Sequence, residues 1–206
     1  MTLDEALAET PIVAIIRGVR PEEVLGIAEA LYTAGVRVVE VPLNSPEPLH
    51  SIQRLAETWR GRMVCGAGTV LSVEDVQAVA TAGGEVVVSP NGRADVIRKT
   101  IELGMAPMPG FGTATEAFEA YAAGARRLKL FPAVTYGAAH VKQLKAVLPK
   151  DATVLAVGGV GADAMAEWRA AGTDGFGVGG EIYRPGQTPE QTLERARALV
   201  EAARAR

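Results

Sequence analysis

The stretch Val36-Arg37-Val38-Val39-Glu40-Val41 is an apolar run of strand length, and Pro42-Leu43-Asn44-Ser45-Pro46-Glu47 follows it directly. Valine favours the extended backbone of a strand. Serine, proline and glutamate in succession are typical of the first turn of a helix. The stretch therefore predicts a β-strand that passes through a short turn into a helix.

The same unit recurs along the chain at intervals of about two dozen residues, which is typical of repeated βα units and a parallel sheet. Ser72 and Thr113 are candidate caps at helix starts. Glycine readily adopts the left-handed conformation at a helix end, and the glycines in such positions are Gly35, Gly83, Gly104, Gly124 and Gly172. The predicted strands are Ile12–Ile16, Val36–Val41, Met63–Ala67, Val86–Val88, Met105–Met108, Arg127–Leu130, Thr153–Ala156 and Gly175–Val178.

Eight βα units in 206 residues favour one α/β domain over residues 1–206, folded as a single closed (β/α)8 TIM barrel. The alternative is an open Rossmann-like sheet. No G-x-G-x-x-G motif opens the first helix, where Arg17-Gly18-Val19-Arg20 follows the first strand, so the barrel is favoured. Residues 1–9 are expected to form a short N-terminal helix that closes the bottom of the barrel.

The composition disfavours several classes of protein. The chain is 48% hydrophobic and 22% charged, with a net charge of −3 and scattered lysines and arginines, so no nucleic-acid partner is expected. No apolar run approaches the roughly 20 residues that a membrane helix needs, and residues 1–10 lack the features of a signal peptide. Cys65 is the single cysteine. These features predict a cytoplasmic protein without membrane contact or an internal disulfide.

Polar residues occur near the ends of the predicted strands. The active sites of barrels form at the carboxyl ends of their strands, which makes these residues candidates for function. The period of two in a strand predicts that Ala67 and Thr69 share the inner face of the barrel. The candidates at the barrel mouth are Arg17, Glu40, Thr69, Ser89, Asn91 and Lys129.

Lys129 lies between Leu128 and Leu130 and is expected to be buried. The ordinary pKa of lysine is about 10.4, and burial close to Arg17 would lower it. A neutral amine can add to a ketone and form an imine, which permits cleavage of a carbon–carbon bond without a metal or another cofactor. The alternative is a buried ion pair between Lys129 and Glu40 that only stabilises the barrel.

Glu40 is the candidate for proton transfer. Its apolar flanks would raise the pKa of the carboxyl toward a range in which it both accepts and returns a proton. No metal site is expected, because His50 and His140 fall in predicted helices and no H-E-x-x-H motif is present. A metal-dependent sugar-phosphate epimerase is therefore disfavoured.

Two groups of glycines accompany the last two predicted strands, and they include Gly158, Gly159, Gly179 and Gly180. The loops at these positions of barrels frequently bind phosphate through backbone N–H groups. The sequence therefore predicts a phosphate site. A barrel that binds sugar phosphates without turnover is an alternative to an enzyme.

Five motifs between Pro11 and Gln187 resemble the family of 2-keto-3-deoxy-6-phosphogluconate and 2-keto-3-deoxy-6-phosphogalactonate aldolases. The resemblance implies that Lys129 forms the imine with the C2 ketone, that Glu40 moves protons, and that Arg17 and Thr69 hold the carboxylate end. It further implies the products pyruvate and glyceraldehyde 3-phosphate, and a homotrimer. The motifs are Ile15-Ile16-Arg17-Gly18, Val39-Glu40-Val41-Pro42-Leu43-Asn44-Ser45-Pro46, Gly66-Ala67-Gly68-Thr69-Val70, Lys129-Leu130-Phe131-Pro132 and Ala156-Val157-Gly158-Gly159-Val160.

The galactonate type is the nearer match, because Pro42-Leu43-Asn44-Ser45-Pro46 resembles its motif and Val157 stands where gluconate-type enzymes carry threonine. A gluconate-type or broad-specificity aldolase is the alternative. Gly180 stands where many relatives carry serine, and Glu181 would repel a phosphate, so unphosphorylated keto-deoxy sugar acids are also considered. The expected substrate-binding residues are Arg17, Asn44, Thr69, Pro90, Phe131, Val157, Gly158, Gly159, Gly179 and Gly180.

Overall fold

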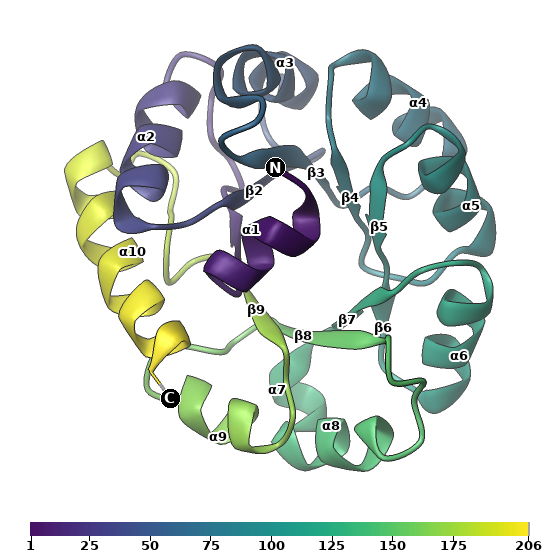
Figure 1. Cartoon of the computed structure of the whole chain (residues 1–206). Helices are drawn as coiled ribbons and strands as arrows, with labels where there is room; N and C mark the ends of the chain where they lie inside the picture. Colours follow the sequence, from purple (N-terminus) through teal and green to yellow (C-terminus); the bar gives the residue numbers. More distant parts are fainter. Residues whose placement is uncertain (206) are drawn as a thin grey trace.

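The computed structural model describes residues 1–205 and contains one parallel sheet that curves into a barrel (Figure 1). The strands follow the order β5-β4-β3-β2-β1-β9-β8-β7-β6. This arrangement confirms the predicted TIM-type barrel. The strands are β1 (Ile12–Ile15), β2 (Val38–Pro42), β3 (Val64–Gly68), β4 (Val86–Val88), β5 (Ala106–Met108), β6 (Gly110–Phe111), β7 (Arg127–Leu130), β8 (Thr153–Val157) and β9 (Gly175–Val178).

The ring of strands closes where β5 and β6 succeed each other with only Pro109 between them. β5 pairs with β4, and β6 pairs with β7. The carbonyl of Pro109 accepts a hydrogen bond from the Lys129 N–H at 2.9 Å. The prediction of eight strands missed β6. Proline has no N–H for a strand ladder, and Pro109 divides the fifth strand of the barrel into two short pieces.

Helices surround the barrel and follow the strands as predicted (Figure 1). Ser72 and Thr113 each form a capping box at the start of a helix. The five predicted helix-ending glycines all have positive φ. The helices are α1 (Leu3–Glu9), α2 (Val24–Ala34), α3 (Pro48–Trp59), α4 (Val73–Thr81), α5 (Ala94–Glu102), α6 (Ala114–Ala122), α7 (Ala133–Tyr136), α8 (Ala138–Lys145), α9 (Met165–Ala170) and α10 (Pro189–Arg204). None of the described helices is long and apolar enough to cross a membrane.

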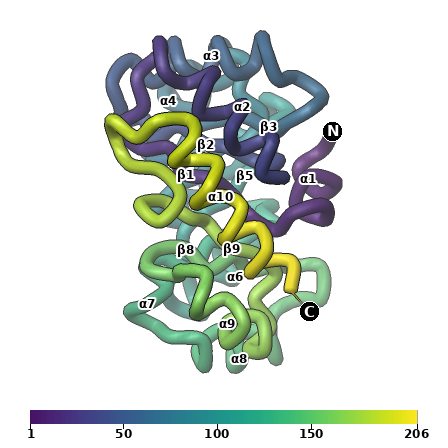
Figure 2. The backbone as a smooth tube through the Cα atoms, turned by 90° about the vertical axis from the view of Figure 1, so that its left-hand side faces the viewer, coloured from purple at the N-terminus to yellow at the C-terminus, as the bar shows by residue number. Residues whose placement is uncertain are grey.

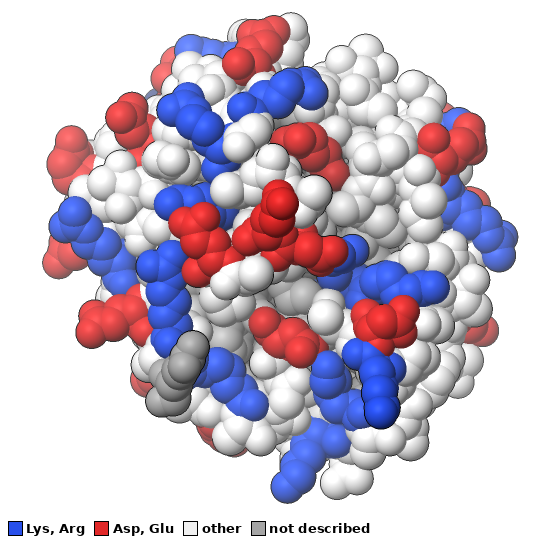
Figure 3. Space-filling model, in the orientation of Figure 1, with Lys and Arg blue, Asp and Glu red and all other residues white. Residues whose placement is uncertain are grey.

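Helix α1 lies across one end of the barrel, as predicted (Figure 1). Leu3 and Ala6 are buried against the apolar side chains that fill the barrel interior. Two ion pairs join α1 to this end, from Glu9 to Arg37 at 2.7 Å and from Asp4 to Arg127. Charged side chains of both signs surround the helix (Figure 3). Both described ends of the chain lie on this side, and α10 packs against α2 (Figure 2).

The apolar core consists of two clusters, one inside the barrel and one between the strands and the surrounding helices. Val64 belongs to the inner cluster, whereas Ala67 belongs to the outer one. The expectation that Ala67 and Thr69 share the inner face is therefore wrong. β3 ends at Gly68, and Thr69 has a φ of 57°, which interrupts the alternation of the strand.

Candidate active site

A cavity of about 310 Å³ opens beyond the carboxyl ends of the strands, at the opposite end of the barrel from α1. It contains every substrate-binding or catalytic residue predicted from the sequence except Asn44. Ile15, Gly177 and Glu181 complete the lining. The lining residues are Ile15, Arg17, Glu40, Thr69, Pro90, Lys129, Phe131, Val157, Gly158, Gly159, Gly177, Gly179, Gly180 and Glu181.

Lys129 projects from β7 and is only 6% exposed. Its neighbours in the sheet are Gly110 and Leu155, and Nζ lies 4.6 Å from the centre of the Phe131 ring. Burial lowers the pKa of the Lys129 amine; the Glu40 carboxylate opposes this effect and the Arg17 guanidinium adds to it. The direction agrees with the prediction and favours the neutral, nucleophilic amine.

Glu40 projects from β2 and is 2% exposed. Burial raises the pKa of its carboxyl to about 7, although Lys129 and Arg17 both act in the opposite direction. Its Oε2 atom has no hydrogen-bond partner, and none of the described salt bridges joins Glu40 to Lys129. The structure therefore does not contain the purely stabilising ion pair that the sequence left as an alternative.

Gly68 provides the space that the Glu40 carboxylate occupies. A Cβ atom at this position would overlap both carboxylate oxygens. The sequence indicated Glu40 as a catalytic candidate, but the need for a glycine at position 68 beside its carboxylate was not predicted. Two glycines two residues apart, Gly66 and Gly68, were the available signal, because alternate positions of a strand face the same side.

Arg17 follows β1 and reaches the cavity from the rim. The Asn44 side-chain oxygen accepts a hydrogen bond from its guanidinium. Asn44 itself is outside the cavity lining, and its amide oxygen contacts Arg17 instead. On the same loop, the Ser45 hydroxyl accepts a hydrogen bond from the Gly18 N–H at 2.9 Å.

Thr69 reaches the cavity by an unusual backbone conformation. Its φ of 57° lies in the left-handed region, which a β-branched residue seldom adopts. Ser89 and Asn91, which the sequence also placed at the mouth, do not line the cavity. Ser89 is buried and donates its N–H to the Met108 carbonyl, whereas Asn91 is exposed. Pro90, between them, is the residue of this loop that reaches the cavity.

The rim beside Lys129 is built from backbone. Gly158 and Gly159 have φ values of 98° and 77°, and Gly179 and Gly180 follow β9. Val157 packs on Gly177, where an added Cβ would lie 2.7 Å from a Val157 methyl carbon. Peptide N–H groups without side chains around them suit an anion. Glu181 also lines the cavity, and its negative charge would repel an anion.

The described part of the chain contains no group of three or more histidine, cysteine, aspartate or glutamate residues that could hold a metal ion. His50 is exposed on α3. His140 on α8 has its Nε2 atom 2.9 Å from the Gly112 carbonyl. Neither histidine lines the cavity.

Comparison with known proteins assigns the family. The family model of KDPG and KHG aldolases matches residues 3–195. The chain belongs to this family. Membership confirms the resemblance that the five sequence motifs indicated.

Named members of the aldolase family match most of the chain. A 2-dehydro-3-deoxy-6-phosphogalactonate aldolase of Escherichia coli K12 is 45% identical over 94% of this chain and 95% of the relative. A solved structure described as native KDPGal has a TM-score of 0.92 at 45% identity, covering 94% of both chains. A designed cube-shaped cage, made by fusing symmetric oligomeric domains, has a TM-score of 0.93 at 45% identity, covering 95% of this chain and 73% of that one.

Proposed function

We propose that this chain is a class I aldolase that cleaves 2-dehydro-3-deoxy-6-phosphogalactonate into pyruvate and glyceraldehyde 3-phosphate. One observation carries the proposal: a buried lysine with a lowered pKa and a buried glutamate with a pKa raised to about 7 face the same cavity. The 45% identity with an aldolase of that name supports the choice of substrate.

Imine formation begins when the neutral Lys129 amine adds to the C2 ketone. Glu40 donates a proton to the hydroxyl of the carbinolamine, which leaves as water and yields a protonated imine. The carboxyl suits this role because a pKa of about 7 keeps both of its protonation states populated at neutral pH. The cavity holds both groups within one small volume, which favours their cooperation.

Cleavage breaks the C3–C4 bond, and its electron pair moves toward the imine nitrogen. Glu40, now ionised, takes the proton of the C4 hydroxyl, so the aldehyde leaves. The remaining enamine takes at C3 the proton that Glu40 has just received, which leaves Glu40 ionised again. Water then hydrolyses the imine, which releases pyruvate and restores the Lys129 amine.

Three residues that line the cavity orient the substrate in this proposal. Arg17, held by Asn44, binds the C1 carboxylate, because a guanidinium offers paired N–H donors to two carboxylate oxygens. Val157 faces C4 without a hydrogen-bonding group, so it does not stabilise the gluconate epimer as a threonine would. Thr69 contacts the same carboxylate end as Arg17.

Imine formation is tested by reducing the enzyme with borohydride in the presence of pyruvate and locating the modified lysine by mass spectrometry. Lys129→Ala should abolish trapping, because the nucleophile is gone. Lys142→Ala is the matched control, since Lys142 is exposed on α8 and lies outside the cavity. Trapping at another lysine in Lys129→Ala would overturn the assignment.

The substrate is tested by measuring pyruvate release from the phosphogalactonate and phosphogluconate epimers side by side, with a chelator present. Release mainly from the galactonate epimer supports the proposal. Equal release from both epimers would support the aldolase activity but contradict the preference for the galactonate epimer that was inferred from Val157. If neither epimer releases pyruvate, the unphosphorylated keto-deoxy sugar acids are assayed in the same way. Release from these acids would change the proposed substrate class, and no release from any of them would indicate a binding protein.

We also propose that the chain forms a homotrimer. The match to a cage built from symmetric oligomeric domains supports self-association. Exposed apolar side chains beside the cavity supply a surface for it, with Val134 at 58% and Tyr136 at 38% exposure. Light scattering coupled to gel filtration measures the mass. The mass of one 21.5 kDa chain would contradict the trimer.

A further inference from the structure

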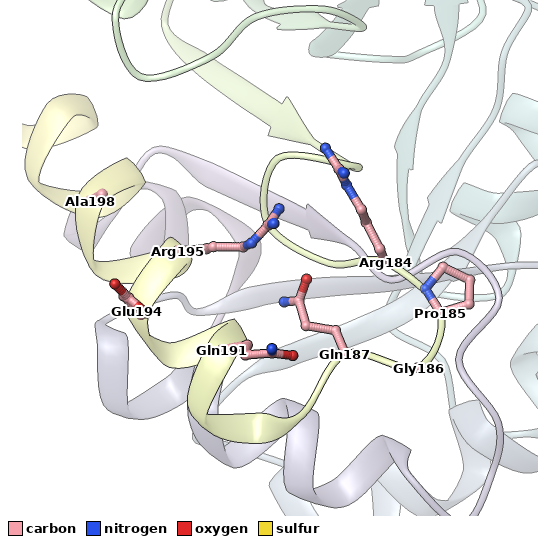
Figure 4. Close-up of a pocket in the computed structure, with 8 residues that line it drawn as sticks. All are labelled: Arg184, Pro185, Gly186, Gln187, Gln191, Glu194, Arg195 and Ala198. Atoms are coloured by element: carbon pink, nitrogen blue, oxygen red, sulfur yellow. The ribbon is translucent and has the colours of Figure 1, made fainter.

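Two more cavities adjoin the candidate active site on the side of Gly180. The first, of about 240 Å³, shares Ile15, Arg17, Gly179 and Gly180 with the active-site cavity. The second, of about 690 Å³, shares Arg184 and Pro185 with the first (Figure 4). The three cavities therefore form a row from Lys129 outward to the start of α10.

Two of the arginines in this row contact the Gly180 carbonyl. Arg184 Nε donates to the Gly180 carbonyl at 2.8 Å, and Arg195 Nη1 on α10 approaches the same oxygen at 3.4 Å. Figure 4 shows both side chains extended toward the loop that precedes Arg184. Both guanidinium groups keep most of their N–H donors free of these bonds, because each has five.

Neither arginine is neutralised by an acid. None of the described salt bridges includes Arg184 or Arg195. Glu194 lines the outermost cavity, but its side chain points away from the two arginines (Figure 4). Two cations thus stand beside a loop whose backbone forms one wall of the active-site cavity.

The loop at Gly179 and Gly180 can bind an anion only through its backbone N–H groups, because these glycines carry no side chains. A Cβ at Gly180 would meet nothing within 4 Å, so the space there is open. Glu181 adds a negative charge to the wall of the active-site cavity. A dianionic group that reaches Gly180 therefore needs nearby positive charge, and the cations in the adjoining cavities on that side are Arg17, Arg184 and Arg195. Because the proposed function places Arg17 on the C1 carboxylate, Arg184 and Arg195 remain for the dianion.

We propose that Arg184, assisted by Arg195, binds the phosphate monoester at the far end of the bound substrate. This inference rests on the proposed aldolase function and assigns residues to its phosphate site. Arg184 supplies charged donors from the outer side of Gly180, while the glycine N–H groups act from the inner side. Arg195, half-buried behind it, adds charge and helps to hold the loop in place.

The test compares two aldehydes in the addition reaction with pyruvate: glyceraldehyde 3-phosphate and unphosphorylated glyceraldehyde. Arg184→Gln should raise KM for the phosphorylated aldehyde about 10- to 100-fold, because it removes hydrogen bonds to a charged group. Arg195→Gln should raise it less. The matched control is Arg197→Gln on the same helix, since Arg197 is exposed and lines none of these cavities. In Arg184→Gln, borohydride trapping with pyruvate should persist, and KM for unphosphorylated glyceraldehyde should rise far less than KM for glyceraldehyde 3-phosphate.

Several outcomes would overturn the inference. An active Arg184→Gln enzyme whose KM for glyceraldehyde 3-phosphate equals that of Arg197→Gln shows that Arg184 does not bind phosphate. If Arg184→Gln raises KM equally for both aldehydes, Arg184 only holds the loop in place. In that case Arg184→Lys, which keeps the charge, should not selectively restore KM for glyceraldehyde 3-phosphate. If the wild-type chain neither traps pyruvate nor turns over either aldehyde, the proposed function and this inference fail together.

Discussion

At the scale of single residues, the cavity combines two ionisable groups whose pKa values shift in opposite directions. Lys129 and Glu40 are both buried in the barrel, and burial is the largest cause of each shift. Burial disfavours the charged form of either group, which lowers the pKa of an amine and raises that of a carboxyl. The neutral forms are the ones that imine formation requires, namely a nucleophilic amine and a proton donor.

The raised pKa of Glu40 predicts a specific pH dependence of stability. The ordinary pKa of the carboxyl is 4.5, and burial in the folded protein raises it to about 7. Between these values the folded state binds more protons, so the free energy of unfolding falls as pH rises from 4.5 to 7. Glu40→Gln should not show this loss. The free energy of unfolding of the variant relative to wild type should therefore increase by about 3 kcal/mol from pH 4 to pH 8.

Urea unfolding at these two pH values measures the difference between the wild type and Glu40→Gln. Glu29→Gln is the matched control, because Glu29 is exposed on α2. The control should show no such change with pH. A Glu40→Gln variant that behaves like the control would mean that the carboxyl is not desolvated in the folded protein.

At the scale of elements, β2 and β3 are matched so that one carries the carboxylate and the other makes room for it. Glu40 pairs with Gly66, and Pro42 pairs with Gly68. Both glycines stand at positions where a Cβ would collide with a neighbour, the Val86 carbonyl at Gly66 and the Glu40 carboxylate at Gly68. The inner face of β3 near the mouth therefore carries no side chains, which leaves volume for Glu40.

Gly68→Ala should displace the Glu40 carboxylate and lower kcat by about 100-fold, since misplacement of a catalytic group by about 1 Å has such an effect. Steady-state pyruvate release measures it, and borohydride trapping shows whether Lys129 still reacts. Gly26→Ala on α2 is the control, because its Cβ meets only Pro189 at 3.3 Å, away from the cavity. Unchanged turnover in Gly68→Ala would show that Glu40 does not need its observed position.

At the scale of the whole molecule, stability and activity belong to opposite ends of the barrel. Helix α1 covers one end, where Leu3 and Ala6 pack inside. Arg204 of α10 ties the same end together through the Glu9 carbonyl at 3.2 Å and the Thr10 hydroxyl. The cavity with Lys129 opens at the other end. In barrels, the carboxyl ends of the strands carry function and the amino ends serve stability.

Leu3→Ala should therefore destabilise the fold by about 2 kcal/mol and leave kcat unchanged, because it empties packed space far from the cavity. Urea unfolding and pyruvate release measure the two quantities. Leu49→Ala on α3 is the control, since Leu49 is 38% exposed. Equal stability of the two variants would mean that α1 does not close the barrel interior.

The sequence by itself determined the features that depend on neighbouring residues along the chain. The helix caps at Ser72 and Thr113 and the positive φ of the five helix-ending glycines follow from local backbone preferences. The inward direction of Glu40 and Lys129 follows from the period of two in a strand. Apolar runs with regular spacing were enough to predict the barrel.

The tertiary structure alone decided which residues meet across strands and loops. The pairing of β5 and β6 with different strands, the left-handed turn at Thr69 and the contact of Asn44 with Arg17 all depend on how separate segments come together. The same holds for Gly68 beneath Glu40 and for Arg195 of α10 beside Gly180. These contacts join residues whose separation along the chain carries no periodic signal, so only packing of the closed barrel brings them within reach of each other.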